Sequence, residues 1–300
     1  MWPSSMNKPG FSTHTPVDSV QWEYRDRQYE ILIKRDDLIH PFVSGNKWRK
    51  LKYNLDSAGR QKARKIVTYG GAFSNHLIAT AYACSVAGIP NVGIVRGDEL
   101  DEHSNYVLRM CHEFGMDLQF VSRAEYDDIK DQDGLSDNGE FHIPEGGANQ
   151  AGIKGCEEIF DSSWFDHEVT DVVCGVGTST TFIGLIRSIP SEIHIHGIAA
   201  LREADYLKRH ITEHINGQTH WTLQTAFARK GFGQIDETLT LTMQNFTSQT
   251  GILLDPVYTG KGIAAIEQMY DSGQFTDQNR VLFLHTGGMT GLLSDRWLKS

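Results

Sequence analysis

The sequence predicts an α/β fold in which short parallel strands alternate with crossover helices. Short runs rich in β-branched or large apolar residues recur along the chain, separated by stretches with apolar residues at spacings of three and four. Several of these runs lead directly into glycine-rich turns, at 70–71, 146–147, 175–177 and 287–288. Alternating β and α elements give parallel strands, and ligands bind beyond the carboxyl ends of such strands. The turns therefore predict one binding cleft.

The expected elements follow from these two periodicities. The strand pattern occurs at 31–34, 65–69, 92–95, 118–121, 172–174, 193–198 and 281–285. The helical pattern places three sets of residues on shared faces: Trp48, Leu51, Leu55 and Ala58; Leu77, Ala81, Cys84 and Ala87; and Ile263, Ile266, Met269 and Tyr270. The acidic, turn-rich run 125–134 is expected to be a solvated surface excursion.

Composition limits the class of protein. The chain has 300 residues, 39% of them hydrophobic, with 28 Lys+Arg against 38 Asp+Glu, a net charge of −10. This balance argues against disorder and against attraction to nucleic acid or an anionic membrane. No apolar run reaches the ~20 residues that span a bilayer, the start lacks a signal-peptide pattern, and the four cysteines form no CxxC pair. We expect a cytoplasmic enzyme of small molecules, without nucleic-acid or membrane partners.

Residues 44–52 concentrate positive charge at the start of a predicted helix. Asn46 is a good N-cap, which makes Lys47 the first helical residue. The helix dipole and the neighbouring Arg49 and Lys50 disfavour the charged form of Lys47. A neutral lysine is a nucleophile that condenses with carbonyls to a Schiff base. The same residues also suit the solvated face of an amphipathic helix, and the sequence leaves both interpretations open.

Residues 68–76, Thr-Tyr-Gly-Gly-Ala-Phe-Ser-Asn-His, form the pattern of strand, glycine turn, cap and helix. Ser74 or Asn75 would cap that helix. The N–H groups at a helix start attract a carboxylate or a phosphate, so an anion site is one interpretation and plain capping the other.

Residues 172–181, Val-Val-Cys-Gly-Val-Gly-Thr-Ser-Thr-Thr, place glycines and four hydroxyl side chains after a strand. Glycines let the backbone approach an anion, and hydroxyls with helix N–H groups hold a phosphate. No Gly-Lys-Ser/Thr follows, which excludes a Walker motif, and Thr180 replaces the third glycine of a dinucleotide fingerprint. The segment indicates a phosphate loop, with a tight strand-to-helix turn as the alternative.

Two further segments could meet a flat ring. In 254–261, Leu-Asp-Pro-Val-Tyr-Thr-Gly-Lys, Tyr258 is fixed between Pro256 and Gly260 and could present its ring as a stacking platform. An ordinary buried tyrosine is the alternative. Thr286, in His-Thr-Gly-Gly at the end of a strand, places a hydroxyl where a cofactor ring could be met.

Together these segments resemble the D-cysteine desulfhydrase/1-aminocyclopropane-1-carboxylate (ACC) deaminase family of pyridoxal 5′-phosphate (PLP) enzymes. The strings Gly-Asn-Lys-x-Arg-Lys and Leu-Asp-Pro-Val-Tyr-x-Gly-Lys are specific. The matching segments follow the family's order over nearly the whole chain: 33–37, 44–52, 70–76, 143–147, 175–185, 227–234, 251–261 and 284–288.

The resemblance implies the tryptophan synthase β-like fold, fold type II, with two three-layer α/β domains and the cofactor in the cleft between them. A smaller α/β domain, 48–146, would be inserted in a larger PLP-binding domain made of 1–47 plus 147–300. A small amino acid as substrate and a homodimer are also implied, and no metal is expected.

Residue roles follow from the same resemblance. Those implied in catalysis are Lys47, as Schiff-base lysine and base at Cα, with Ser74 and Tyr258. Those implied to bind the cofactor are Lys47, Asn75 at its phenolic oxygen, Lys50, Gly177, Thr178, Ser179, Thr180 and Thr181 at its phosphate, Tyr258 against its ring and Thr286 at its ring nitrogen. Those implied to bind substrate are Ser74, Asn75 and His76 at its carboxylate, with Thr259 and Phe232.

The chain departs from ACC deaminases at two positions. Those enzymes carry Glu after the tyrosine of the Pro-Val-Tyr string and Leu before the final Gly-Gly, where this chain has Thr259 and Thr286, as D-cysteine desulfhydrases do. A carboxylate near the ring nitrogen favours a pyridinium, a strong electron sink, whereas a hydroxyl leaves a weaker sink that suffices for β-elimination. We therefore expect α,β-elimination of D-cysteine to pyruvate, ammonia and sulfide, with ACC deamination as the alternative.

Three other departures, Phe73, Phe232 and Trp48, reshape the expected pocket. They leave open a homologue that binds PLP without turnover. A dinucleotide-binding oxidoreductase using 175–177 is a further alternative, although no clear acidic residue closes the next strand at 198–201.

Overall fold

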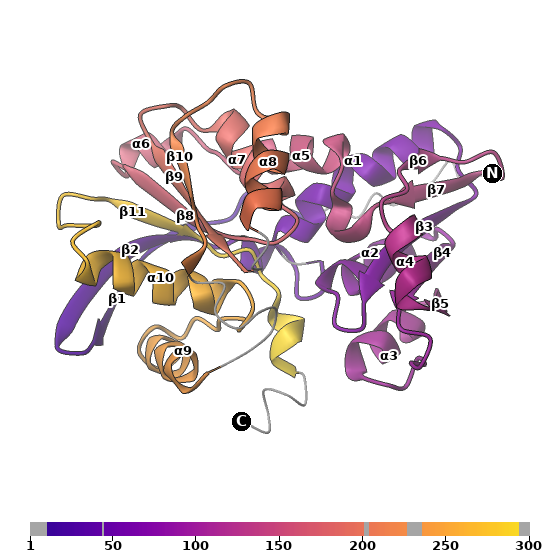
Figure 1. Cartoon of the computed structure of the whole chain (residues 1–300), viewed down its shortest axis with the longest axis horizontal. Coiled ribbons are helices and arrows are strands. Elements are labelled where there is room, and N and C mark those ends of the chain that lie inside the picture. The colour runs from indigo at the N-terminus through magenta and orange to yellow at the C-terminus, as the bar shows by residue number, and fades with distance from the viewer. Residues whose placement is uncertain (1–10, 44, 201–203, 227–235, 294–300) are drawn as a thin grey trace. The chain divides into compact units, whose positions relative to one another are not determined.

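The computed structural model describes residues 11–43, 45–200, 204–226 and 236–293. Their backbone forms two compact units, one from 11–13 and 39–155 and the other from 14–38 and 156–292 (Figure 1). The domain boundaries expected at 48 and 146 remain a prediction; the first unit contains all of that interval and extends beyond it on both sides. No helix within the described ranges is long and apolar enough to cross a membrane.

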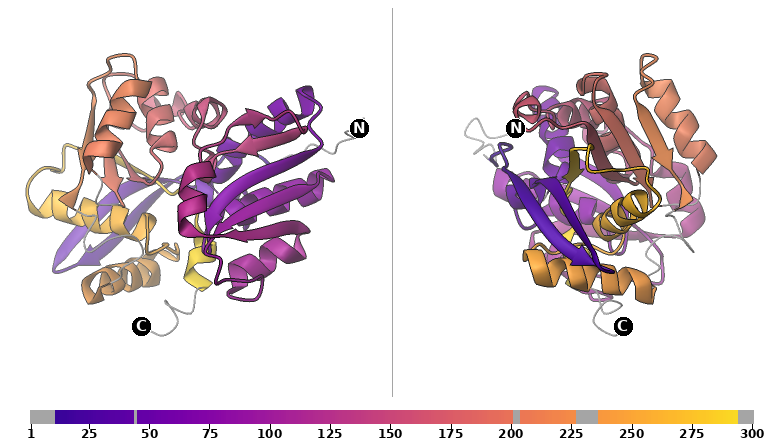
Figure 2. Two further views of the ribbon diagram at one scale, coloured as in Figure 1. Left: turned by 45° about the vertical axis from the view of Figure 1, so that its right-hand side comes forward. Right: turned by 90° about the vertical axis from the view of Figure 1, so that its left-hand side faces the viewer.

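The first unit is built on a mixed five-stranded sheet, whose purple-to-magenta strands run side by side in Figure 2. Its strands pair in parallel except at β6, which is antiparallel to β7. In sheet order they are β5 (Met116–Val121), β4 (Asn91–Arg96), β3 (Lys65–Gly71), β7 (Glu140–Ile143) and β6 (Gly134–Leu135). Its helices are α1 (Asn46–Arg60), α2 (Asn75–Ala87), α3 (Tyr106–Glu113), α4 (Arg123–Ile129) and the start of α5 (Gln150–Glu157), with the 3-10 turn η2 (Glu145–Gly147).

Side-chain alternation along β3 divides its core between the two faces of the sheet. Ile66 packs with the apolar stripe of α1 and with α2, whereas Val67 packs with Tyr126 of α4. The predicted α1 and α2 faces are confirmed, since every residue assigned to them is buried. The acidic run 125–134 is not wholly a surface excursion, because its first half completes α4 and fully buries Tyr126.

The second unit is built on a mixed six-stranded sheet with an antiparallel hairpin, β1–β2, at one edge and parallel pairing elsewhere. In sheet order the strands are β1 (Val17–Tyr24), β2 (Arg27–Lys34), β11 (Val281–Leu284), β8 (Asp171–Val176), β9 (His194–Ala199) and β10 (Trp221–Gln224). Its helices are α6 (Ser163–Asp166), α7 (Thr180–Ser188), α8 (Ala204–His214), α9 (Glu237–Thr250) and α10 (Thr259–Asp271), with 3-10 turns η1 (Asp36–Ile39) and η4 (Met289–Leu293) at its limits.

All seven predicted strands are present, each with bounds within a few residues of the expected ones. The sequence pattern missed the edge strands β1, β6 and β10 as well as β7. The α/β class with largely parallel sheets is therefore confirmed.

Candidate functional site

Lys47 lies in the first turn of α1, one residue later than expected. Gly45, with φ 57°, is the N-cap and Asn46 is already helical, so the prediction of Asn46 as N-cap was wrong by one position. Gly45 adopts this left-handed φ without a Cβ penalty and, as a glycine, provides no side-chain cap for the helix. The amide of Asn46 instead accepts a hydrogen bond from Lys47 Nζ at 2.8 Å. The Asn46 side chain thus orients the amine rather than the helix.

The two basic residues after Lys47 are turned into the protein. Arg49 is 1% exposed and donates to the carbonyl oxygen of Thr13 at 3.1 Å. Lys50 is buried and donates to the carbonyl oxygen of Gly146 at 3.1 Å. Neither side chain lies on a solvated helix face, so the alternative of a simple amphipathic surface is wrong for these two residues.

Ser74 caps α2, which decides between the two capping candidates. Its Oγ accepts hydrogen bonds from the backbone N–H groups of His76 and Leu77 at 3.2 and 3.3 Å. The preceding Gly70 is required here, since a Cβ at that position would lie 2.6 Å from Ser74 Oγ. Asn75 is the first residue of α2 and half-buried, at the helix end where N–H groups attract anions.

His76 is a buried neutral imidazole in one fixed tautomer. Thr68 Oγ1 donates its single proton to the carbonyl oxygen of Ile143 at 2.9 Å, so it must accept from His76 Nε2–H, also at 2.9 Å. Burial first, and then the charges of Lys47 and Lys50, hold the pKa of His76 well below its usual value. Nδ1 is therefore an unprotonated acceptor, and among the described residues it has no hydrogen-bond partner. Such an atom calls for a donor.

In the second unit, β8 leads into the turn that the sequence marked as a phosphate loop. A Cβ on Gly175 would lie 3.0 Å from Cβ of Tyr258, and one on Gly177 would lie 3.0 Å from the Tyr258 hydroxyl. Both glycines are thus needed to let the tyrosine lie against the turn. Tyr258 precedes α10 and is placed within the second unit at the carboxyl end of β8.

The turn is strained at Ser179, the N-cap of α7. Ser179 has φ 59° and ψ −14°, in the left-handed region, and is 2% exposed. This residue turns the backbone directly before α7, whose helix start suits an anion, while the Thr180 N–H donates to the carbonyl oxygen of Thr178 at 2.9 Å. Thr180 and Thr181 are buried in the first turn of α7.

Asp255, which the sequence analysis gave no role, fixes the position of Tyr258. Its carboxylate accepts from the N–H groups of Val257, Tyr258 and Thr259 at 2.8–3.3 Å and from the Thr259 hydroxyl at 2.9 Å. Thr259 is 1% exposed, and its hydroxyl also accepts from the Asp255 N–H at 2.6 Å. The Asp-Pro step before Tyr258 was the available sequence signal.

Thr286 follows β11 and is 7% exposed. The adjoining His285 is anchored by Nε2 to the carbonyl oxygen of Leu253 at 2.7 Å, and its Nδ1 accepts from Gly287 N–H at 3.3 Å. These two bonds fix the backbone on both sides of Thr286. Phe232, expected in the substrate pocket, lies outside the described residues.

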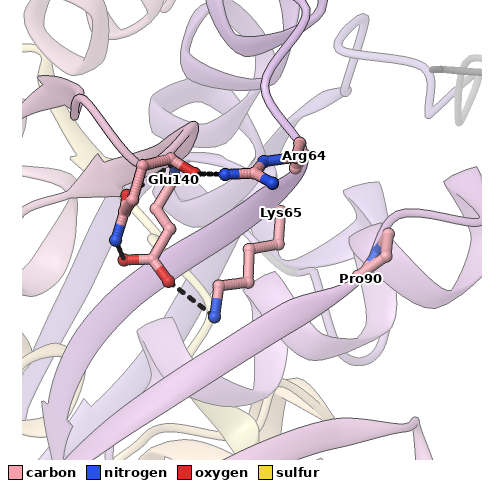
Figure 3. A pocket seen from close by; sticks show the side chains of 5 residues that line it. Arg64, Lys65, Pro90 and Glu140 are labelled. Atoms are coloured by element: carbon pink, nitrogen blue, oxygen red, sulfur yellow. Dashed lines mark hydrogen bonds and ion pairs between the residues drawn. The ribbon is translucent and has the colours of Figure 1, made fainter.

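A pocket of about 350 Å³ in the first unit is not this site (Figure 3). Lys65 and Glu140, which pair at 2.6 Å across it, are the first residues of β3 and β7, so the pocket lies at the amino ends of these parallel strands. Ligands of such sheets bind at the carboxyl ends. Its lining residues are Arg64, Lys65, Pro90, Asn138 and Glu140. Within the described ranges no cluster of His, Cys, Asp or Glu could hold a metal ion.

The two α/β units, one with an amine at a helix start and one with a glycine turn before a helix, suit an enzyme that uses a phosphorylated carbonyl cofactor. Residues 11–287 match the family described as pyridoxal-phosphate dependent enzyme. The chain belongs to this family.

Its relatives carry two kinds of name. A Thermotoga maritima protein, 30% identical over 93% of this chain and 95% of its own length, is provisionally named 1-aminocyclopropane-1-carboxylate deaminase. A Yersinia pestis D-cysteine desulfhydrase is 28% identical over 88% of each chain. The mitochondrial bifunctional D-cysteine desulfhydrase/1-aminocyclopropane-1-carboxylate deaminase of Arabidopsis thaliana is 28% identical over 93% of this chain and 78% of its own.

The fold is shared with solved structures. The crystal structure of an ACC deaminase homologue superimposes with a TM-score of 0.76 at 24% identity, covering 94% of this chain and 91% of that one. A hydrogen sulfide-producing enzyme from Fusobacterium nucleatum gives 0.62 at 14% identity over 91% and 93%. The expected fold type II is thereby confirmed.

The residues present fit PLP, the cofactor of this family. The first unit supplies a primary amine, Lys47, and a buried acceptor, His76 Nδ1, for which the described residues offer no partner. The second supplies a glycine-lined turn, closed by Tyr258 and followed by a helix start. An amine can condense with the aldehyde of the cofactor, and the N–H groups of a helix start can bind its phosphate. Each unit therefore supplies groups that suit one end of the cofactor.

Proposed function

We propose that the chain is a PLP-dependent lyase that eliminates the β-substituent of a small amino acid, with D-cysteine as the first substrate to test. The observation that carries this choice is the pair of neutral hydroxyl side chains, Thr259 and Thr286, where ACC deaminases have glutamate and leucine. The names of the Yersinia and Arabidopsis relatives support it.

Each half of the site has a distinct task in this proposal. Lys47 Nζ would hold the cofactor at its aldehyde, and the same amine would serve as the base for the Cα proton of the substrate. Ser74 and Asn75 at the start of α2 bind the substrate carboxylate, His76 lies beside them with an Nδ1 that only accepts, and Asn75 also meets the cofactor's phenolic oxygen. Lys50 and the turn 177–181 hold the phosphate.

The ring is held by two residues of the second unit. Tyr258, fixed by Asp255, packs against the ring, and Thr286 meets the ring nitrogen with a hydroxyl. When bound, the cofactor supplies an electron-withdrawing ring that stabilises negative charge at Cα. Because Thr259 stands where ACC deaminases have glutamate, the ring nitrogen gains no carboxylate partner to keep it protonated, and the weaker sink favours substrates with a good β-leaving group.

The Asp255 carboxylate does not replace the missing glutamate. Its oxygens already accept three backbone N–H groups and the Thr259 hydroxyl, so its hydrogen-bonding capacity is directed to the start of α10. Because the Thr259 hydroxyl is buried, Thr259 affects the substrate pocket through its backbone, which is continuous with that of Tyr258.

ACC deamination remains the second candidate, because the 30% identical relative carries that name. A homodimer in the cytoplasm is the working arrangement that we propose for either activity.

Purified protein tests the proposal directly. Borohydride reduction should fix PLP covalently to the tryptic peptide that contains Lys47, as read by mass spectrometry, and Lys47→Ala should abolish the adduct. Sulfide and pyruvate should be released from D-cysteine faster than from L-cysteine, with ACC turned over more slowly still. A protein that takes up no PLP would refute the cofactor assignment, and a preference for ACC would refute the argument from Thr259 and Thr286.

A further inference from the structure

We propose that His210 is a positioning residue that holds Ser179 in the conformation the phosphate-binding turn requires. The inference deepens the proposed function and rests on it for the identity of the anion. Both residues belong to the second unit, but they are 31 positions apart in sequence and on different helices, α7 and α8.

Ser179 is in a conformation that its side chain disfavours. A left-handed backbone at φ 59° is strained for a residue with a Cβ, and glycine is the residue that adopts it without cost. The same φ shapes the turn, because it sets the directions of the backbone groups on both sides of Ser179 and lets the Thr180 N–H donate to the carbonyl oxygen of Thr178 at 2.9 Å. A conformation that is both strained and functional must be maintained by its surroundings.

The hydroxyl of Ser179 makes two short contacts that together define the direction of each bond. Its Oγ lies 2.7 Å from the carbonyl oxygen of Thr178 and 2.7 Å from Nδ1 of His210. The carbonyl can only accept, so the hydroxyl proton goes to Thr178 and His210 Nδ1–H donates to Ser179. Both bonds of the hydroxyl are therefore made to other protein groups, and Ser179 would bind a phosphate through its backbone.

The position of His210 is fixed by ring contacts within α8 and by a hydrogen bond between α8 and α7. Its ring stacks on Tyr206 at 6.1 Å and 15°, and packs against His214 at 4.4 Å. The C-terminal end of α8 is tied to α7, because Arg187 Nε donates to the carbonyl oxygen of His214 at 2.7 Å. The helix α8 therefore contacts α7 near both ends of α7, at Ser179 and at Arg187. These contacts fix the position from which the imidazole bonds to Ser179.

The consequence concerns the phosphate rather than the reacting end of the cofactor. Losing the His210 bond lets Ser179 leave the left-handed region, which disperses the N–H groups of the turn. Affinity for PLP should fall, whereas affinity for pyridoxal, which lacks the phosphate, should not change. A purely structural role in holding α8 would lower thermal stability without this difference between the two ligands.

The first experiment measures dissociation constants of PLP and pyridoxal for the full-length chain and for His210→Ala. We expect PLP to bind about fivefold more weakly, the loss of one neutral hydrogen bond, and pyridoxal to bind as before. His210→Asn, whose side-chain N–H can replace Nδ1–H, should restore part of the PLP affinity. Thr212→Ala is the matched control on the same helix, since its exposed hydroxyl bonds only to the carbonyl oxygen of Lys208 among the bonds described.

A double-mutant cycle with Ser179→Gly separates positioning from packing. Glycine adopts the left-handed backbone without help, so His210→Ala should cost little PLP affinity in the Ser179→Gly background and about fivefold in the wild-type background. Equal losses in both backgrounds, or equal losses of PLP and pyridoxal, would overturn the inference. A wild-type protein that binds no PLP would instead refute the proposed function, which keeps the two failures distinct.

Discussion

Gly177 and Tyr258 are matched to each other: a Cβ on the glycine would lie 3.0 Å from both Cε1 and the hydroxyl oxygen of the tyrosine. Asp255 prevents the tyrosine from moving away easily, because its carboxylate binds the Tyr258 N–H at 3.1 Å. The phosphate turn and the expected ring platform are therefore one rigid assembly within the second unit.

Gly177→Ala should disturb this assembly without unfolding the chain. The added methyl group must displace the tyrosine side chain or the turn by a few tenths of an ångström, because its contacts are with the Tyr258 ring and hydroxyl. PLP affinity should fall about tenfold, measured by titration of the purified variant, while the melting temperature changes little. An unchanged dissociation constant would show that Tyr258 does not contact the cofactor through this turn.

Gly155→Ala should have the opposite profile, a loss of stability in the first unit. Here α5 crosses α1 so closely that a Cβ would lie 1.8 Å from the carbonyl oxygen of Arg49, a backbone atom that cannot rotate away. We expect a loss of at least about 1–3 kcal/mol in the free energy of unfolding, measured by denaturant titration. Gly71→Ala is the matched control, since its Cβ would meet only Arg96 Nη2 at an ordinary 3.7 Å. Equal stability of the two variants would contradict the close crossing.

Glu267 makes the stability of the second unit depend on pH. Burial, opposed by hydrogen bonds from Trp22 Nε1 and Thr242 Oγ1, raises the pKa of this carboxyl from 4.5 to about 7. The folded state therefore retains a proton that the unfolded state loses, and stability falls as pH rises from about 4.5 through 7. Glu267→Gln should remove this dependence and be more stable than wild type at pH 8, by on the order of 2 kcal/mol. Parallel stability curves for the two proteins between pH 5 and 8 would rule it out.

Strand recognition from sequence succeeded where both faces of a strand are buried. The core strands β3 and β8 are continuous apolar runs and were predicted, whereas β1 alternates polar with apolar residues and was missed. Only Val20 and Trp22 of β1 are buried, as suits an edge strand with one face in water. The helix over Arg123–Ile129 was missed because acidic residues outnumber the single buried Tyr126.

Within the site, local features were predictable and paired features were not. A serine before a helix with glycines behind it predicts a cap, and Ser74 is one. By contrast, the bond between Ser179 and His210 joins residues that no short-range pattern connects. The same holds for Thr68 and His76, which meet because β3 and the first turn of α2 pack together. These pairs depend on tertiary packing, which periodicity and capping rules do not encode.

The bond from His76 to Thr68 has a consequence that does not require the cofactor. With Thr68 donating to Ile143, the imidazole is confined to the Nε2–H tautomer, and its lowered pKa keeps it neutral at physiological pH. Its bare Nδ1 can accept a hydrogen bond but cannot donate one to a substrate carboxylate. The contribution of the Ser-Asn-His segment to carboxylate binding should therefore come from Ser74, Asn75 and the helix start.

Thr68→Val tests this arrangement, because valine keeps the shape of threonine and removes the acceptor. In the wild type, nitrogen-15 NMR at pH 7 should show His76 protonated at Nε2 alone, with the signal assigned by its loss in His76→Gln. In Thr68→Val the Nε2–H and the Ile143 carbonyl lose their partner, at about 1–3 kcal/mol of stability. The Nδ1–H tautomer should become populated, because among the described residues Nδ1 has no hydrogen-bond partner that selects its state. A ring that is protonated at Nδ1 in the wild type, or a doubly protonated ring, would contradict the hydrogen-bond directions deduced from Thr68. A wild-type tautomer that persists unchanged in Thr68→Val would show instead that another group of the fold selects it.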